Sequence, residues 1–160
     1  MKNGTVQDKI NLEEIMDLTI IISNRLKRIN FNKMTFSNDD FIRDSFIPPL
    51  MHIGESVNHL NADIAEEVTS NHAKDIIGMR NRLAYAYLGI DERVLWKTIT
   101  NEVPKLGLNT INALEKYFNI TYSKEKNILI AIQKDLEQKT KTTTLKITFS
   151  KPKENDGLER

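Results

Sequence analysis

The chain has 160 residues, 39% of them hydrophobic, which allows one modest core and one globular domain with tails. Its 23 lysines and arginines balance 22 aspartates and glutamates, which excludes a nucleic-acid binder that acts through a large overall positive charge. The chain contains no cysteine, so disulfides and thiolate metal sites are excluded. Its longest apolar run, IMDLTIII at residues 15–22, falls short of the roughly 20 residues that cross a bilayer, and no secretory signal is visible. We therefore expect a cytoplasmic protein without a membrane span.

Helices dominate the prediction as far as residue 136. Residues 7–28 and the adjoining Ile29 carry one apolar stripe at helical spacing, formed by Ile10, Ile15, Leu18, Ile22, Leu26 and Ile29. Ser37 or Asn38 is a candidate N-cap for a second helix, which Pro48 and Pro49 must kink or restart. Further helices are predicted over residues 73–88, 92–102, 106–118 and 123–136, and a short helix or turn over 61–71. Asp91 is the expected N-cap of the helix at 92–102, which should end before Pro104.

The C-terminal segment has a different pattern. Leu145, Ile147 and Phe149 alternate with polar residues in TTTLKITFS, which predicts a strand. A lone strand is not stable, so this lysine-rich tail should be disordered or pair with a partner. We expect an all-α helical domain over residues 7–120, an additional helix over 121–138, and a basic tail over 139–160 that could form a strand.

The stretch GMRNRLAYAYLGID at residues 78–91 is unusually polar for the end of a helix. On a wheel of about 100° per residue, Ile76, Leu83 and Tyr87 lie within roughly 40° of one another and form a buried stripe. Arg80 lies about 40° from Ile76, so it needs an anionic partner or an open cleft. Tyr85 points to the opposite side of the helix.

The longer segment DIIGMRNRLAYAYLGIDERVLWKTITNEVPKL resembles the signature of the HepT-like ribonuclease toxins, which belong to the HEPN superfamily. The motif of that family joins an arginine and a polar residue to a histidine, and commonly continues as His-x-Tyr. The upstream IGESVNHL, together with Trp96 and Pro104, also resembles the family. The likeness covers about residues 10–118 and implies a HEPN-type helical bundle.

The resemblance identifies Arg80 as the motif arginine, Asn81 as its polar follower and Tyr87 as the motif tyrosine. It implies metal-independent RNA cleavage, in which the ribose 2′-OH attacks the adjacent phosphate and arginine stabilises the charge. Tyr85 stands at the histidine position, and a phenol with a reference pKa of about 10 is a poor base. We therefore expect weak or absent activity, through either an inactivating change or natural degeneration. The alternative is a non-catalytic HEPN module that binds RNA, a nucleotide or a protein.

The resemblance also implies partners. The family forms homodimers with a shared cleft, and its cognate MNT-type nucleotidyltransferase antitoxin adds AMP to the motif tyrosine, here Tyr87. Positions five residues apart on a straight helix splay by about 140°, so Arg80 and Tyr85 of one copy cannot hold one phosphate. Either the helix is irregular, or two copies combine their residues. No cofactor is implied.

His52, Glu55 and His59 share one helical face, a pattern that zinc can use. The spacing alone is weak support, and we expect no metal site. An ion pair between Glu55 and Arg80, which would support the cleft, is the favoured interpretation. Arg82 is either a second supporting residue of the cleft or a solvated surface charge.

Overall fold

The structure, a computed structural model, describes residues 4–85 and 89–150, and the side chains of these residues as far as residue 142. Its elements in chain order are α1 (Val6–Arg28), α2 (Lys33–Asn38), α3 (Asp40–Asp44), α4 (Ile47–Asn58), α5 (Ala62–Val68), α6 (Ala73–Tyr85), α7 (Glu92–Lys97), the π-helical turn η2 (Thr98–Glu102), α8 (Val103–Phe118) and α9 (Ser123–Ser150). No strand occurs in these ranges, so the all-α prediction is confirmed. None of the helices described there is long and apolar enough to cross a membrane.

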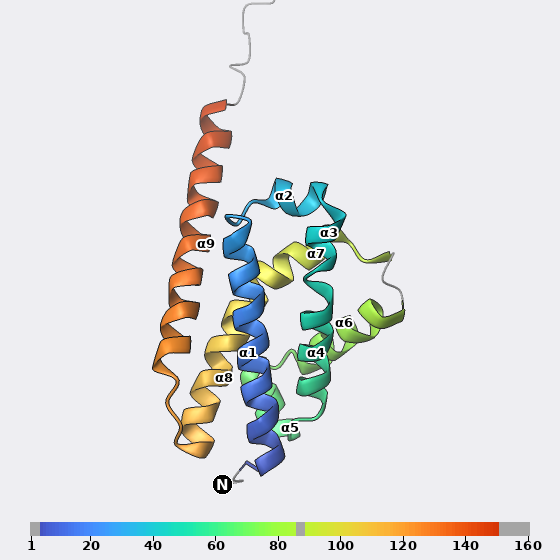
Figure 1. Cartoon of the computed structure of the whole chain (residues 1–160), viewed down its shortest axis with the longest axis vertical. Coiled ribbons are helices and arrows are strands. Elements are labelled where there is room, and N and C mark those ends of the chain that lie inside the picture. Colours follow the sequence, from blue (N-terminus) through green and yellow to red (C-terminus); the bar gives the residue numbers. More distant parts are fainter. Residues whose placement is uncertain (1–3, 86–88, 151–160) are drawn as a thin grey trace, which may run out of the picture.

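α1 is the central helix, and it packs against α4 on one side and against α8 and α9 on the other (Figure 1). Its first turn is closed by a capping box, in which Thr5 and Asp8 each accept a hydrogen bond from the other's backbone N–H. The Asp8 carboxylate also accepts the N–H of Asn61 at 2.8 Å, which ties α1 to the start of α5. Burial alone would raise the pKa of Asp8, but these hydrogen bonds hold it below its ordinary value.

The predicted apolar stripe of α1 is confirmed in the middle of the helix. Ile15 and Ile22 are fully buried, whereas Ile10 near the first turn is 50% exposed. The helix also buries four polar residues, Asp8, Asn11, Thr19 and Ser23, and the hydroxyls of the last two donate to backbone carbonyls three or four residues earlier. The face is thus less apolar than the spacing suggested, without leaving these hydroxyls unsatisfied.

Two short helices precede α4, where the sequence predicted a polar break. Asn32 caps α2 and Asp39 caps α3, each by accepting backbone N–H groups with its side chain. The N-cap expected at Ser37 or Asn38 is wrong, because both residues lie inside α2. The restart at Pro48–Pro49 is confirmed, because the prolines occupy the first turn of α4, where no N–H is needed.

The chain stays helical from α7 through η2 into α8, so the end expected before Pro104 is wrong. Pro104 lies in the first turn of α8, and in a regular α-helix its ring would clash with the carbonyl of Thr100. The wider π-helical turn accommodates the proline, and the chain continues without a break. Trp96, on α7, is half-buried, with its ring centroid 5.1 Å from that of Phe36.

The strand expected over Leu145, Ile147 and Phe149 is wrong, because α9 runs as one helix to Ser150. The helix continues across residue 138, where the sequence placed the start of a separate tail. Extending an existing helix costs less than nucleating one, and a strand here would need a partner that the described part of the chain does not offer.

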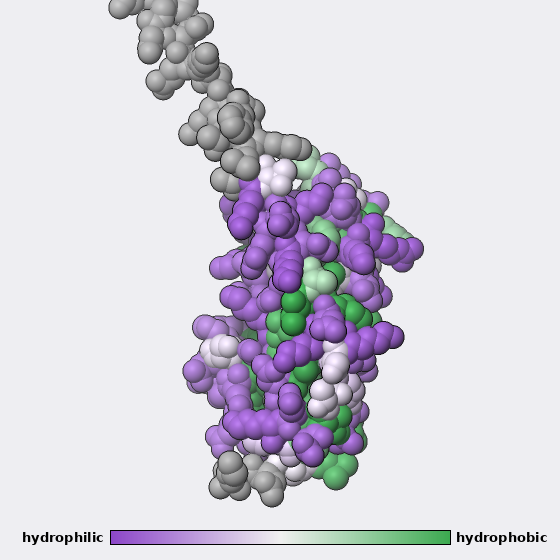
Figure 2. Space-filling model, turned by 90° about the vertical axis from the view of Figure 1, so that its left-hand side faces the viewer, coloured by the Kyte–Doolittle hydropathy of each residue, from purple (hydrophilic) through white to green (hydrophobic). Residues whose placement is uncertain are grey.

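α9 attaches to the bundle through its first half and extends past the end of α1 (Figure 1). Leu129 and Ile132 are the most buried residues of α9 as far as residue 142, and they anchor it against α1 and α8. The surface on this side is mostly hydrophilic, with hydrophobic residues showing between polar ones in the middle and lower part of the view (Figure 2). The helix is therefore held by few apolar contacts along its N-terminal half.

Candidate active site

α4 and α6 approach each other at Gly54 and Arg80, and this contact places the motif arginine. A Cβ atom added at Gly54 would lie 2.4 Å from Cβ and 2.9 Å from Cγ of Arg80. The stem of Arg80 therefore packs directly on α4, while its side chain remains 31% exposed. The upstream IGESVNHL segment and the arginine motif, which are separate in the sequence, meet at this point.

The guanidinium of Arg80 is held by a carboxylate and an amide. Its Nη2 lies 2.8 Å from Oε2 of Glu55 on α4, and its Nη1 donates to Oδ1 of Asn81 at 2.9 Å. The ion pair expected between Glu55 and Arg80 is thus present. An arginine has five N–H donors, so these two contacts leave others for an anionic ligand.

Tyr85 is the last residue of α6 and is 84% exposed. Its hydroxyl has no hydrogen-bond partner within the described part of the chain. Because α6 is α-helical from Ala73 to Tyr85, an irregular helix does not bring Arg80 and Tyr85 together. The two residues are splayed by about 140°, with Arg80 against α4 and Tyr85 in solvent.

The buried stripe predicted for the motif region is present in part. Leu83 is buried, as the predicted stripe requires, and Ile76 is partly buried. Met79, which the wheel did not single out, is buried between them. Tyr87 lies outside the described residues, so its place in the stripe and its modification stay predictions.

The histidines that suggested a zinc site do not gather around one. Nε2 of His59 lies 3.6 Å from Oε1 of Glu55, but the other oxygen of Glu55 pairs with Arg80. His52 is exposed. Across residues 4–85 and 89–150, no three His, Cys, Asp or Glu side chains are grouped closely enough to hold a metal ion. Glu55 is therefore better described as the partner of Arg80 than as a ligand.

Arg82 faces a different part of the molecule from Arg80. It lines a cleft of about 640 Å³ between α6 and the continuous segment of α7, η2 and α8. Lys97 of α7 and Lys105 of α8 line the same cleft. The sequence did not single out either lysine, because nothing in their spacing relates them to α6. Arg82 is exposed and lines this second cleft, so support of the Arg80 cleft by Arg82 stays a prediction.

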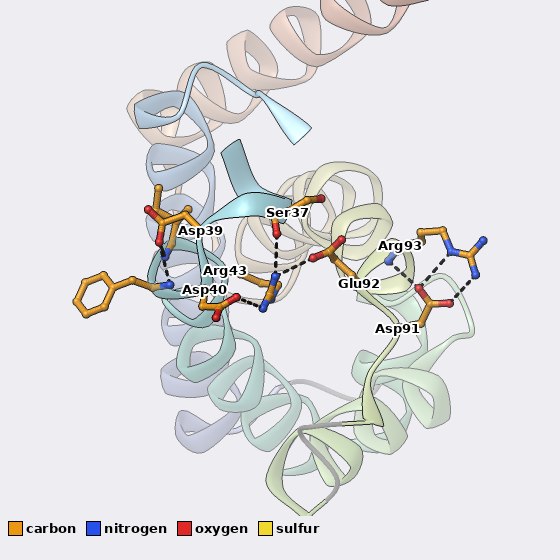
Figure 3. Close-up of polar contacts among 9 residues, drawn as sticks. Ser37, Asp39, Asp40, Arg43, Asp91, Glu92 and Arg93 are labelled. Carbon is orange, nitrogen blue, oxygen red and sulfur yellow. Dashed lines mark hydrogen bonds and ion pairs between the residues drawn. The ribbon is translucent and has the colours of Figure 1, made fainter. Parts of the chain in front are cut away.

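A cluster centred on Arg43 connects α3 to the start of α7 (Figure 3). Val94 and Lys97 of α7 line the cleft. The Arg43 guanidinium contacts Glu92 at 2.7 Å, Asp40 at 2.5 Å and the carbonyl of Ser37 at 3.1 Å. Burial would lower the pKa of Arg43, but the two carboxylates raise it. Asp91, the predicted N-cap of α7, accepts the backbone N–H two residues later at 2.8 Å and is confirmed in that role.

Known proteins resemble this chain over most of the bundle. The family described as Ribonuclease HepT-like matches residues 10–111. "Putative RNase TTE0752" of Caldanaerobacter subterraneus subsp. tengcongensis is 32% identical over 105 residues, which cover 66% of this chain and 92% of the relative. "Putative RNase MJ1380" of Methanocaldococcus jannaschii is 34% identical over 98 residues, covering 61% and 88% of the two chains.

"Probable ribonuclease HepT" of Thermococcus cleftensis is 30% identical over 95 residues, which cover 59% of this chain and 84% of the relative. No solved structure matches the chain. The family match spans the crossing of α4 and α6 with the Arg80 motif, which form the candidate site, and also the separate cleft that Arg82 lines. The chain therefore belongs to the HepT-like ribonuclease family.

Proposed function

We propose that this protein is a metal-independent ribonuclease by descent, in which the ribose 2′-OH attacks the adjacent phosphate of RNA. The observation that carries the proposal is the anchored guanidinium of Arg80, which Glu55 and Asn81 orient while other N–H donors remain available. A preorganised arginine can bind a phosphate and stabilise the negative charge that grows on it in the transition state.

We further propose that Tyr85 impairs this chain. A histidine can accept or donate a proton near neutral pH, whereas a phenol is almost entirely protonated there. General acid–base catalysis typically contributes about 100- to 10,000-fold, so Tyr85→His should raise the rate of RNA cleavage by that order. The assay follows cleavage of a labelled single-stranded RNA in the presence of a chelator.

Two matched variants control this experiment. Tyr85→Phe removes the hydroxyl without adding a base and should stay as weak as the unaltered chain. Arg80→Ala in the Tyr85→His background should lose the restored activity, because the phosphate contact is gone. If Tyr85→His cleaves RNA no faster than Tyr85→Phe, the account of position 85 is wrong.

The active form is proposed to be a homodimer that combines Arg80 of one copy with residue 85 of the other, because one α6 splays these positions apart. A mixing experiment tests this. The unaltered chain lacks the histidine, and a chain with both Arg80→Ala and Tyr85→His lacks the arginine. Only mixed dimers hold one site with both groups, so refolding the two chains together should create activity that neither has alone. An inactive mixture beside an active Tyr85→His homodimer would place the site within one copy.

The biological role we propose is the toxin of a toxin–antitoxin pair in the cytoplasm, with an MNT-type nucleotidyltransferase as antitoxin. This role rests on the family resemblance and on Tyr87 at the position of the motif tyrosine. Expression of the Tyr85→His chain should arrest growth, and co-expression with the cognate nucleotidyltransferase should relieve the arrest. Intact-protein mass should then increase by one AMP group, and Tyr87→Phe should abolish the increase.

The second candidate is a non-catalytic module that binds RNA, a nucleotide or a protein. The tyrosine at position 85, where the family motif has histidine, favours it. RNA cleavage by the Tyr85→His chain distinguishes the two candidates. A chain whose Tyr85→His form binds RNA without cleaving it, and does not arrest growth, is a binding module.

A further inference from the structure

The cleft between α6 and the α7–η2–α8 segment is separate from the Arg80 contact, since Arg80 faces α4. Its volume of about 640 Å³ lies within the range of sites that hold small ligands, about 300–1,000 Å³. Five apolar side chains contribute to its lining: Val68, Ile76, Met79, Val94 and Leu106. A flat apolar group such as a nucleobase could pack against them.

The cations of this cleft have not been neutralised by the fold. Arg82, Lys97 and Lys105 make no ion pair with any residue in the described ranges, whereas Arg80, Arg43 and Lys116 each contact a carboxylate. The cleft also contains two carboxylates, those of Asp75 and Glu102. The first lies 3.2 Å from Nδ1 of His72. Three cations therefore face two carboxylates, and the excess of one positive charge favours an anionic ligand.

One residue of the cleft, Arg82, lies near position 85 on α6. Arg82 and Tyr85 are three residues apart, so their side chains lie within about 60° and are neighbours on the helix surface. Arg80, at about 140° from Tyr85, is not. A strand of RNA whose reacting phosphate sits beside residue 85 would thus pass the cleft next.

We propose that this cleft holds the nucleotide next to the cleaved bond of a single-stranded RNA, with its phosphate on Arg82 and the two lysines and its base on the apolar lining. The inference rests on the proposed function for the position of the reacting phosphate. RNA is favoured over an acidic peptide because the cleft adjoins the position where RNA chemistry is proposed, and because apolar surface beside backbone cations suits unpaired nucleotides.

The test measures binding of the full chain to a fluorescent 2′-O-methyl single-stranded RNA, which cannot undergo attack by a 2′-OH. Lys97→Glu with Lys105→Glu should weaken binding at least 10-fold, and the milder change of both lysines to glutamine should weaken it less. Loss of two phosphate contacts should also reduce the slope of log affinity against log salt by about 1.4. The matched control is Lys124→Glu with Lys134→Glu on α9, two exposed lysines without an ion pair among the described residues. The RNA affinity of this control variant should fall far less than that of the cleft double variant. Unchanged thermal unfolding confirms that each variant is folded.

If the cleft double variant and the control double variant lose RNA affinity equally, the binding is non-specific electrostatic attraction and the proposal is overturned. The proposal is also overturned if the cleft double variant binds RNA as tightly as the unaltered chain. If the cleft double variant instead weakens only the complex with the cognate nucleotidyltransferase, the cleft is a protein-docking site and the proposal is wrong. Weaker RNA binding in the cleft pair supports the proposal even if Tyr85→His proves inactive, in which case only the catalytic function fails.

Discussion

Replacement of Gly54 by alanine tests whether the contact between α4 and α6 positions Arg80. The added methyl group would lie 2.4 Å from Cβ of Arg80 and 3.3 Å from the carbonyl oxygen of Ile76. Carbon atoms in contact prefer about 3.5–4.0 Å, so α6 must move by roughly 1 Å. Overpacking of this kind typically costs about 1–3 kcal/mol, while glycine to alanine within a helix gains about 1 kcal/mol in propensity.

Gly78→Ala is the matched control, because Gly78 also lies inside a helix and a Cβ there would meet nothing within 4 Å. It should stabilise the protein by about 1 kcal/mol. The propensity gains of the two substitutions cancel in the comparison, so the difference between them isolates the packing cost. We expect Gly54→Ala to be less stable than Gly78→Ala by about 1–3 kcal/mol.

Urea unfolding followed by circular dichroism measures this difference through the midpoint at constant m value. A second measurement uses the Tyr85→His background, where a shift of about 1 Å in Arg80 should slow RNA cleavage by up to about 100-fold. Equal stability of the two alanine variants would show that α4 and α6 do not approach closely at Gly54. Full activity in the Gly54→Ala variant would show that this approach does not position Arg80.

The other predictions concern polar contacts outside the site. Asp8→Ala removes three hydrogen bonds and should lower the free energy of unfolding, measured with urea, by about 2–4 kcal/mol. Because folding lowers the pKa of Asp8, the stabilisation by its carboxylate is present above the ordinary pKa of 3.8 and is lost as the pH falls through the pKa of the folded state. The variant lacks this carboxylate, so it should lose less stability in acid than the unaltered chain. Arg43→Lys should lower the thermal midpoint by a few degrees, because an ammonium cannot reproduce the fork that reaches Glu92, and a neutral result would show the cluster to be unimportant. Glu67 raises the pKa of the Tyr117 phenol, so Glu67→Gln should bring that pKa back toward 10 in an ultraviolet titration.

The contact of Arg80 with Glu55 could be predicted from the sequence, because two independent signals agreed. The wheel placed a charge beside a buried stripe, which requires an anionic partner, and the resemblance supplied a nearby carboxylate. Lys97 and Lys105 could not be predicted in the same way. They line the same cleft as Arg82 on a segment where the π-helical turn keeps α7 and α8 continuous across Pro104, and the sequence suggested a break there.

The wrong prediction of a strand near the C-terminus has a physical explanation. Period-two alternation over a few residues is weak support for a strand, and the lysines and threonines around Leu145 are compatible with either structure. What decides the outcome is the preceding helix, which Leu129 and Ile132 anchor on the bundle. Such anchoring is a property of the tertiary structure and leaves no local signal in the residues that follow it.

Stability and chemistry are separable at position 85 but not at position 80. Tyr85 is 84% exposed and packs against nothing that the core depends on, so substitutions there should change the free energy of unfolding by no more than about 0.5 kcal/mol. Arg80 is packed on Gly54 and paired with Glu55, so its removal changes the contact between two helices as well as the phosphate site. A loss of activity in Arg80→Ala therefore has two explanations, whereas a gain in Tyr85→His has one. Position 85 is for this reason where the chemistry of the family can be lost or restored without a change in the fold.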